Sequence, residues 1–243
     1  MPQRKILLLD GPHSPWVDML ADFTDDTASQ FESFTDASTA RTAFQRSPHD
    51  LAFINPGLMT LPFAQALSAR RGTVSDFRLF ALGAKPPKDI PWDGVFEAPP
   101  SMADFQKKLF TQLRFPQKLR VLVIDDEEEI GRMVRDFLEK RVDPSFEVQY
   151  APNGEKGMSE ILKDPPDVLV LDIKMPYKDG REVYREVRKK KMRFPVIVFF
   201  DAISGDEMAE MRKHGSPAVV EKGAPQSALP ELVELIKKMY YFA

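Results

Sequence analysis

The chain has 243 residues, of which 43% are hydrophobic and 29% charged, a composition typical of folded protein and enough for two domains. Its 34 Lys and Arg residues against 37 Asp and Glu give a net charge of −3, so no basic excess predicts nucleic-acid binding. No cysteine is present, which excludes disulfides, thiolate metal sites and thiol catalysis and fits a reducing compartment. The apolar runs are short and no signal peptide is recognisable, so we expect a cytoplasmic protein that does not cross a membrane.

The N-terminal half predicts short strands that alternate with helices. We expect strands at residues 5–9, 51–54, 78–82 and 94–96, a weaker strand near 29–34, and a closing helix at 102–113. The strand segments are brief apolar runs, as expected for strands that are buried on both faces of a sheet.

The C-terminal half shows the same alternation more clearly. Strands are predicted at residues 120–124, 147–150, 168–171, 196–200 and 218–220, and helices at 127–140, 154–162, 180–191, 205–214 and 226–239. In the last helix, Leu229, Leu232 and Ile236 recur at helical spacing and would face the core. Five such β/α units predict a parallel sheet with helices on both faces.

The two halves align with each other, which indicates an internal duplication. Residues 7–10 lie over 122–125, and residues 50–55 lie over 167–172. We therefore predict the α/β class, with two doubly wound (βα)5 domains that each contain a five-stranded parallel sheet. Their expected bounds are residues 1–115 and 119–243, with a short linker at 116–118.

Charged side chains follow three strands of the C-terminal half. Asp125 and Asp126 end the first strand, Asp172 ends the third, and Lys222 ends the fifth. The carboxyl ends of parallel strands meet at one edge of a sheet, so these side chains should converge. Converging carboxylates need a cation, and Mg²⁺ accepts few carboxylates and keeps several waters. Each of these residues alone has an ordinary interpretation, as a helix cap, a turn former or a surface charge. Their convergence at one edge of the sheet favours a functional site.

These segments resemble the receiver domain of two-component response regulators, over about residues 119–239. The resemblance rests on VLVIDDE at 121–127, VLDIKMP at 170–176, and the spacing from Gly215 to Lys222. It implies a flavodoxin-like fold, and by the weaker alignment the same fold for the N-terminal half.

The resemblance also implies roles for individual residues. Asp172 would accept a phosphoryl group from a histidine kinase or phosphotransfer protein, and Lys222 would contact the phosphoryl oxygens. Asp125, Asp126, Asp172 and the main-chain carbonyl of Lys174 would hold Mg²⁺. These roles suit phosphoryl transfer, which needs an oxygen nucleophile and cations to offset charge.

Several positions depart from the family pattern. The family places Ser or Thr after the fourth strand, where this chain has Phe200 or Asp201, depending on where the strand ends. Neither side chain donates a hydrogen bond as a hydroxyl does. The aromatic switch position on the fifth strand is Val219. We therefore expect phosphorylation without the family's usual switch, and we interpret nearby Ser204 as a helix cap.

The N-terminal half resembles a receiver that has lost its chemistry. Asp10 is retained, but Gly11 replaces the second acid, Asn55 the phosphoacceptor, Gly83 the hydroxyl residue and Ala98 the lysine. We interpret this half as a pseudo-receiver used for binding or dimerisation.

The functional prediction is a response regulator without enzymatic activity. We expect it to signal through contacts with an unidentified downstream protein, since no residues after Met239 are left for a DNA-binding domain. The sequence leaves a homodimer open. The alternative is a phosphorylation-independent tandem pseudo-receiver scaffold. An aspartate-nucleophile phosphatase is disfavoured, because such enzymes carry a second aspartate where this chain has Lys174.

Overall fold

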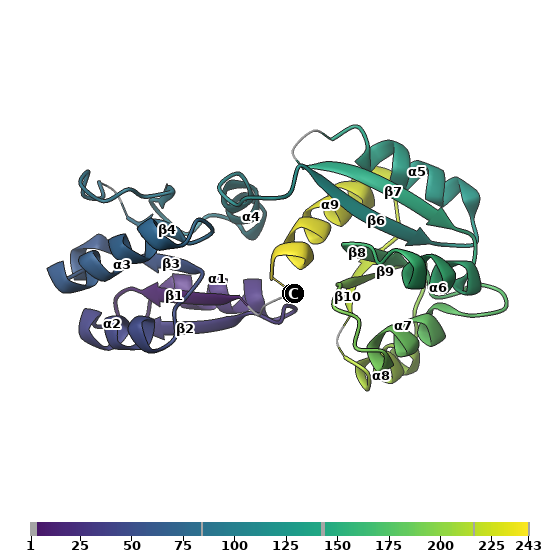
Figure 1. The fold of residues 1–243 in the computed structure, drawn as a ribbon, viewed down its shortest axis with the longest axis horizontal. Helices are drawn as coiled ribbons and strands as arrows, with labels where there is room; N and C mark the ends of the chain where they lie inside the picture. Colours follow the sequence, from purple (N-terminus) through teal and green to yellow (C-terminus); the bar gives the residue numbers. More distant parts are fainter. Residues whose placement is uncertain (1–3, 84, 142–143, 216, 243) are drawn as a thin grey trace. The chain divides into compact units, whose positions relative to one another are not determined.

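The computed structural model describes residues 4–83, 85–141, 144–215 and 217–242, so the predicted domain ends at 1–3 and 243 lie outside the described residues. The chain divides into two compact units, one up to Arg114 and one of Phe115–Tyr241, each an α/β structure (Figure 1). Among the residues that the structure describes, no helix combines the length and the hydropathy needed to cross a membrane.

The N-terminal unit is a five-stranded parallel sheet in the order β2-β1-β3-β4-β5. Its elements are β1 (Lys5–Leu9), α1 (Pro15–Thr24), β2 (Gln30–Phe34), α2 (Ala37–Arg46), β3 (Leu51–Ile54), η1 (Pro56–Leu58), α3 (Leu61–Thr73), β4 (Arg78–Leu82), β5 (Gly94–Phe96) and α4 (Met102–Phe110). The central strands β1, β3 and β4 are buried almost throughout because helices cover both faces.

Two apolar layers hold this unit together. On one face, Phe44 of α2 and Phe63 and Leu67 of α3 pack on the sheet. On the other face, Trp16 of α1 and Phe105 of α4 stack with aromatic side chains of the strands. Aromatic side chains bury large areas and prefer such tilted contacts, so they supply much of this core.

The C-terminal unit has the same topology, with the order β10-β9-β8-β6-β7 and all neighbours parallel. Its elements are β6 (Lys118–Ile124), α5 (Glu128–Leu138), β7 (Ser145–Ala151), α6 (Gly154–Lys163), β8 (Val168–Leu171), α7 (Gly180–Lys189), β9 (Val196–Phe200), α8 (Gly205–Arg212), β10 (Ala218–Glu221) and α9 (Pro225–Phe242). The first strand is internal, as in flavodoxin-like sheets, so the prediction of two flavodoxin-like α/β folds is confirmed.

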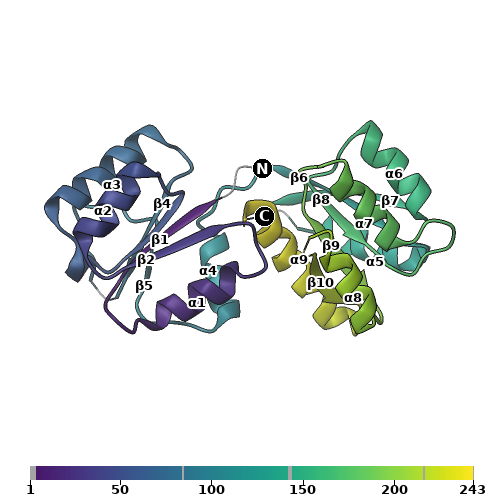
Figure 2. The ribbon, with the colours of Figure 1, turned by 90° about the horizontal axis from the view of Figure 1, so that it is seen from below.

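Helices lie on both faces of this second sheet (Figure 2), and alternate residues of its strands pack against the two layers. Val121 and Val123 point to a core made with α5 and α9. Leu122 and Ile124 point to the opposite core, made with α6, α7 and α8. Because both faces are buried, the strand register is fixed, and so is the place where each strand ends.

Candidate functional site

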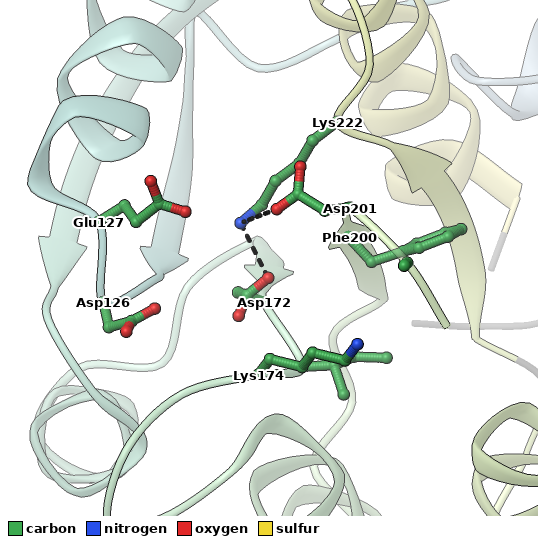
Figure 3. A pocket seen from close by; sticks show the side chains of 9 residues that line it. Asp126, Glu127, Asp172, Lys174, Phe200, Asp201 and Lys222 are labelled. Carbon is green, nitrogen blue, oxygen red and sulfur yellow. Dashed lines mark ion pairs between the residues drawn. The ribbon is translucent and has the colours of Figure 1, made fainter. Parts of the chain in front are cut away.

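Lys222 lies at the centre of a charged cluster at the carboxyl edge of the second sheet (Figure 3). Its Nζ atom lies 2.9 Å from Oδ1 of Asp172 and 3.0 Å from Oδ2 of Asp125. A third carboxylate, that of Asp201, lies 3.6 Å from the same nitrogen. One ammonium group therefore contacts three carboxylates that are far apart in the sequence.

The parallel register of the sheet brings these residues together. The last residues of β6 and β8, Ile124 and Leu171, are paired, and Asp172 donates its backbone N–H to the Ile124 carbonyl at 2.8 Å. At the other side, Lys222 donates its backbone N–H to the carbonyl of Phe200, the last residue of β9, at 2.6 Å. The side chains that follow these strands therefore lie close together at the carboxyl edge of the sheet, as expected for a doubly wound sheet.

The loop after Asp172 returns tightly beneath it. Gly180, the first residue of α7, donates its N–H to the Ile173 carbonyl at 2.9 Å. A Cβ atom at residue 180 would lie 2.0 Å from the backbone oxygen of Asp172, a distance that no real contact allows. Glycine is therefore required here by the close approach of two backbones.

The inner part of the cluster is buried, and burial sets its electrostatics. Asp125 is 1% exposed, Lys222 4% and Asp172 5%. Burial raises the pKa of the Asp125 carboxyl to about 6, although the Glu127 N–H and Lys222 act against that rise. Burial alone would lower the pKa of Lys222, but its hydrogen bonds to Asp172 and Asp125 outweigh burial and raise it, which keeps the ammonium charged.

The cluster opens into a pocket of about 270 Å³. Its lining is mostly charged and comprises Asp126, Glu127, Asp172, Ile173, Lys174, Phe200, Asp201, Ala202 and Lys222. Sequence reasoning missed Glu127, although it is the third member of the acidic run that begins at Asp125. Asp125 lies deeper, where it accepts a hydrogen bond from the Glu127 N–H at 3.0 Å.

The oxygen donors of this pocket fit a magnesium ion. Within the described part of the chain, no three or more His, Cys, Asp or Glu side chains are already gathered as a metal cage. Mg²⁺ does not need such a cage, since it is bound through one or two carboxylates and keeps several waters. Asp126, Asp172 and Lys174 line the pocket, which is polar and open enough for a hydrated cation.

The two candidate residues after the fourth strand, Phe200 and Asp201, point in different directions. Phe200 is the last residue of β9, and its ring points away from Asp172, whereas Asp201 follows the strand and turns its carboxylate toward Lys222 (Figure 3). Val219 lies on β10 with 40% of its surface exposed. Ser204 caps α8 in a reciprocal capping box with Glu207, so the interpretation of Ser204 as a cap is confirmed.

At the same edge of the N-terminal sheet, the Asp10 carboxylate accepts hydrogen bonds from uncharged side chains. Oδ1 of Asp10 accepts a hydrogen bond from Nδ2 of Asn55 at 2.8 Å, and Oδ2 accepts one from the Ser14 hydroxyl at 2.6 Å. Oδ1 of Asn55 in turn accepts the N–H of Gly57 at 2.9 Å. The Asp10 carboxylate is therefore satisfied without the lysine that serves the C-terminal cluster.

The C-terminal unit is a doubly wound α/β domain with an acidic pocket and a buried lysine at the carboxyl edge of its sheet, which is where ligands bind in folds of this class. The family model "Response regulator receiver domain" matches residues 121–234. The C-terminal half of this chain therefore contains a response regulator receiver domain.

Relatives support this assignment over the same half. The chain is 29% identical over 120 residues to the transcriptional regulatory protein RprY of Bacteroides fragilis (strain YCH46), which covers 49% of this chain and 50% of that protein. It is 33% identical over 110 residues to the alkaline phosphatase synthesis transcriptional regulatory protein PhoP of Bacillus subtilis (strain 168), covering 42% and 45%. It is also 28% identical over 123 residues to a protein-glutamate methylesterase/protein-glutamine glutaminase of Trichodesmium erythraeum (strain IMS101), covering 50% and 35%. The chain thus spans half or less of the length of these relatives.

Proposed function

We propose that this protein is a response regulator that accepts a phosphoryl group on Asp172 from a histidine kinase or phosphotransfer protein. One observation carries the proposal. The Lys222 ammonium lies 2.9 Å from Asp172 and 3.0 Å from Asp125, at the head of an acidic pocket that reaches Asp172. This is the arrangement needed to hold an oxygen nucleophile beside a cation.

The residues divide the chemistry between them. An oxygen of Asp172 attacks phosphorus while the bond from phosphorus to the donor breaks, which leaves an acyl phosphate on the chain. Lys222 already contacts Asp172 and offsets the negative charge that arrives with the phosphoryl oxygens. The deep position of Asp172 excludes most water from the nucleophile, since only 5% of its surface is exposed.

Asp125, Asp126, Asp172 and the Lys174 carbonyl would hold Mg²⁺ in this proposal. When bound, the ion supplies positive charge that stabilises the transferring phosphoryl group. Asp126 lines the open pocket, so it is the carboxylate most readily available to a hydrated ion. We expect Asp126→Ala to weaken Mg²⁺ binding more than Asp136→Asn, which removes an exposed carboxylate on α5 outside the pocket.

The N-terminal domain, residues 1–115 before a linker at 116–118, is proposed to be a pseudo-receiver. Its hydrogen-bonded Asp10 and Asn55 support this, because an amide is a poor nucleophile and the carboxylate is already occupied. We propose that it binds a downstream protein or a second copy of the chain. Signalling by the receiver domain, residues 119–243, would then proceed through protein contacts without enzymatic activity.

The test is the intact mass of the protein after incubation with Mg²⁺ and acetyl phosphate. Wild type should gain one phosphoryl group, and Asp172→Asn should gain none. Asp136→Asn, which removes an exposed carboxylate on α5 outside the pocket, should label like wild type. Equal labelling of Asp172→Asn and wild type would overturn the assignment of Asp172.

A second candidate is a phosphorylation-independent scaffold, in which both halves are pseudo-receivers. The carboxylate of Asp201 favours it, because this side chain stands beside Lys222 where the family has a hydroxyl. No labelling of wild type, with Mg²⁺ binding still detectable, would favour the scaffold.

A further inference from the structure

Asp201 differs from the other two carboxylates around Lys222. The side chain of Asp125 is 1% exposed and that of Asp172 6%, whereas that of Asp201 is 70% exposed. Its Oδ2 lies 3.6 Å from Lys222 Nζ (Figure 3), and the exposure of its side chain places it on the solvent side of the pocket. Asp201 therefore contacts the lysine from the side by which a phosphoryl donor would reach Asp172.

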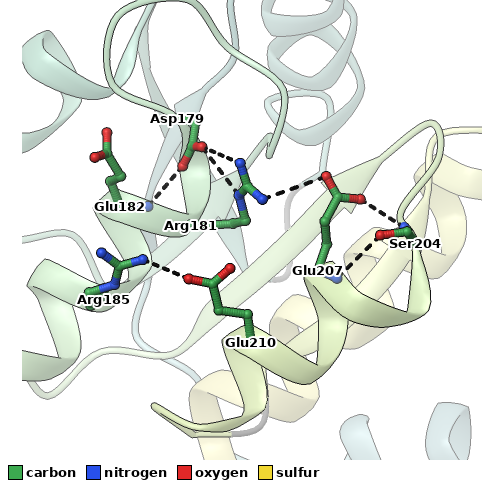
Figure 4. Close-up of polar contacts among 7 residues, drawn as sticks. All are labelled: Asp179, Arg181, Glu182, Arg185, Ser204, Glu207 and Glu210. Atoms are coloured by element: carbon green, nitrogen blue, oxygen red, sulfur yellow. Dashed lines mark hydrogen bonds and ion pairs between the residues drawn. The ribbon is translucent and has the colours of Figure 1, made fainter.

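The backbone on both sides of Asp201 is anchored. Before it, the Phe200 carbonyl accepts the Lys222 N–H at 2.6 Å. After it, the Ser204 N–H donates to Glu207 at 2.8 Å, and the Glu207 N–H donates to the Ser204 hydroxyl at 3.2 Å (Figure 4). The short loop thus holds the backbone of Asp201 beside the pocket, while 70% of its side chain is exposed to solvent.

Two ion pairs link α8, which follows this loop, to α7. Arg181 donates to Asp179 at 2.7 Å and lies 3.8 Å from Glu207, the capping-box partner of Ser204 (Figure 4). One turn further along both helices, Arg185 pairs with Glu210 at 2.9 Å. The loop that carries Asp201 is therefore tied to the folded unit by contacts on both sides of it.

We propose that Asp201 competes with the incoming phosphoryl group for Lys222 and so restrains phosphorylation of Asp172. The inference rests on the proposed function of Asp172. An ionised Asp201 accepts hydrogen bonds and donates none, so it cannot hold a phosphoryl oxygen as a hydroxyl would. It also adds a negative charge at the mouth through which the anionic donor enters.

During the transfer step, Asp201 has to move away from Lys222. An Asp172 oxygen forms a bond to phosphorus, the bond between phosphorus and the donor oxygen or nitrogen breaks, and the donor keeps that electron pair. The phosphoryl oxygens then approach Lys222 from the open side. Because Asp201 is mostly exposed, it gives way by rotating into solvent, and its competition slows the step without abolishing it.

Asp201 is a positioning residue in this proposal, acting through Lys222, and its removal should leave the fold intact. Exposed ion pairs contribute little to stability, since solvent screens them. The test compares initial rates of phosphoryl gain from acetyl phosphate with Mg²⁺, followed by intact mass, in wild type, Asp201→Asn and Asp201→Thr. The matched control is Asp206→Asn, which removes an exposed carboxylate of the same segment that does not line the pocket.

We expect Asp201→Asn to be phosphorylated about fivefold faster than wild type, the order expected for one mostly exposed charge 3.6 Å from Lys222 Nζ in surroundings close to bulk water. Asp201→Thr should be at least as fast. The advantage should shrink as ionic strength rises from about 0.05 to about 1 M, because salt screens exposed charges, whereas a merely structural effect would not follow salt in this way.

Three other outcomes of this experiment would each contradict a part of the proposal. If Asp201→Asn labels no faster than wild type and Asp206→Asn, the competition does not exist. If only Asp201→Thr is faster, the missing hydroxyl limits the reaction and the charge does not. If wild type and all Asp201 variants gain no phosphoryl group, the proposed function itself fails, and the inference fails with it.

Discussion

Lys222 stabilises two carboxylates that are almost completely buried, so the balance of charge inside the C-terminal unit depends on one side chain. Removing one partner of a buried ion pair leaves uncompensated charge in a region of low polarity. Removing one of the two acids leaves a matched pair. Replacing the lysine should therefore lower the stability of the C-terminal unit, and replacing one of the two acids should raise it.

Lys222→Met should destabilise the C-terminal unit by about 3 kcal/mol at neutral pH, because Asp125 and Asp172 would remain buried without their cation. Urea unfolding followed by tyrosine fluorescence measures this, since all five tyrosines lie in the C-terminal half. The control is Lys118→Met, which breaks the exposed Lys118–Glu147 pair at 3.2 Å and should cost less than about 1 kcal/mol. Equal effects of the two substitutions would contradict the central role of Lys222.

The raised pKa of Asp125 predicts a pH dependence of stability. A carboxyl whose folded pKa, about 6, exceeds its ordinary 3.8 contributes stability that is fully present below 3.8 and is lost as pH rises through 6. Asp125→Asn stays uncharged, so it should gain stability relative to wild type between pH 4 and pH 7, by at most about 3 kcal/mol. Urea unfolding of both proteins at several pH values checks this, and parallel curves would refute it.

Much of the candidate site was visible in the sequence as residue types at the ends of strands. The pattern placed Asp125, Asp172 and Lys222 at one edge, and the structure brings their side chains into contact. The sequence left Phe200 and Asp201 as alternatives for the position where the family has Ser or Thr, because a fourth strand longer by one residue moves that position from Phe200 to Asp201. It also missed the contact between Asp201 and Lys222, which depends on side-chain direction.

Among the elements, buried strands were predicted best. The segments at 168–171 and 196–200 are strands with those bounds, because continuous apolar runs mark strands covered on both faces. The edge strand β7 was harder. The prediction at 147–150 was too short, since β7 runs from Ser145 to Ala151 with polar residues at alternate positions. Helix ends differed as well: the last helix extends to Phe242, beyond the predicted 239, because its final turn is apolar.

The first residue of α7 gives an element-scale prediction. Gly180→Ala should destabilise the C-terminal unit by about 2 kcal/mol or more, since the new Cβ would lie 2.0 Å from the Asp172 carbonyl oxygen. Gly205→Ala is a matched control at the first residue of α8, where nothing lies within 4 Å of the added carbon. That substitution should be neutral or stabilising by up to about 1 kcal/mol. Tyrosine-monitored urea unfolding compares the two, and similar midpoints would contradict the close approach.

At the scale of the whole molecule, one fold occurs twice with two different chemistries. Both units contain a parallel sheet of the same order with an aspartate after the first strand. In the C-terminal unit that aspartate meets a lysine, and in the N-terminal unit Asp10 meets Asn55 and Ser14. The fold therefore tolerates either a lysine or uncharged amide and hydroxyl groups as partners of this aspartate, and the second aspartate, Asp172, is present at the C-terminal edge where the N-terminal edge has Asn55.

Restoring the nucleophile to the N-terminal unit should not restore the chemistry. Asn55→Asp replaces the amide that donates to Asp10 at 2.8 Å by a second carboxylate, with Ala98 where the lysine would stand. Two facing carboxylates repel, so the N-terminal unit should lose about 2 kcal/mol at pH 7 and recover as the pH falls below about 4. Trp16 and Trp92 are the two tryptophans of the chain and both lie in this unit, so tryptophan fluorescence follows its unfolding alone.

The same exchange at a helix cap provides the control for that experiment. Asn153 caps α6 by accepting the Lys156 N–H at 2.9 Å, and aspartate caps helices equally well, so Asn153→Asp should leave the stability of the C-terminal unit, followed by tyrosine fluorescence, unchanged. In a chain that also carries Asp172→Asn, Asn55→Asp should gain no phosphoryl group from acetyl phosphate. A phosphoryl gain there would show that this edge needs only its nucleophile to accept a phosphoryl group and would contradict the expected loss of its chemistry. An N-terminal unit equally stable at pH 7 would contradict the predicted repulsion between the two carboxylates.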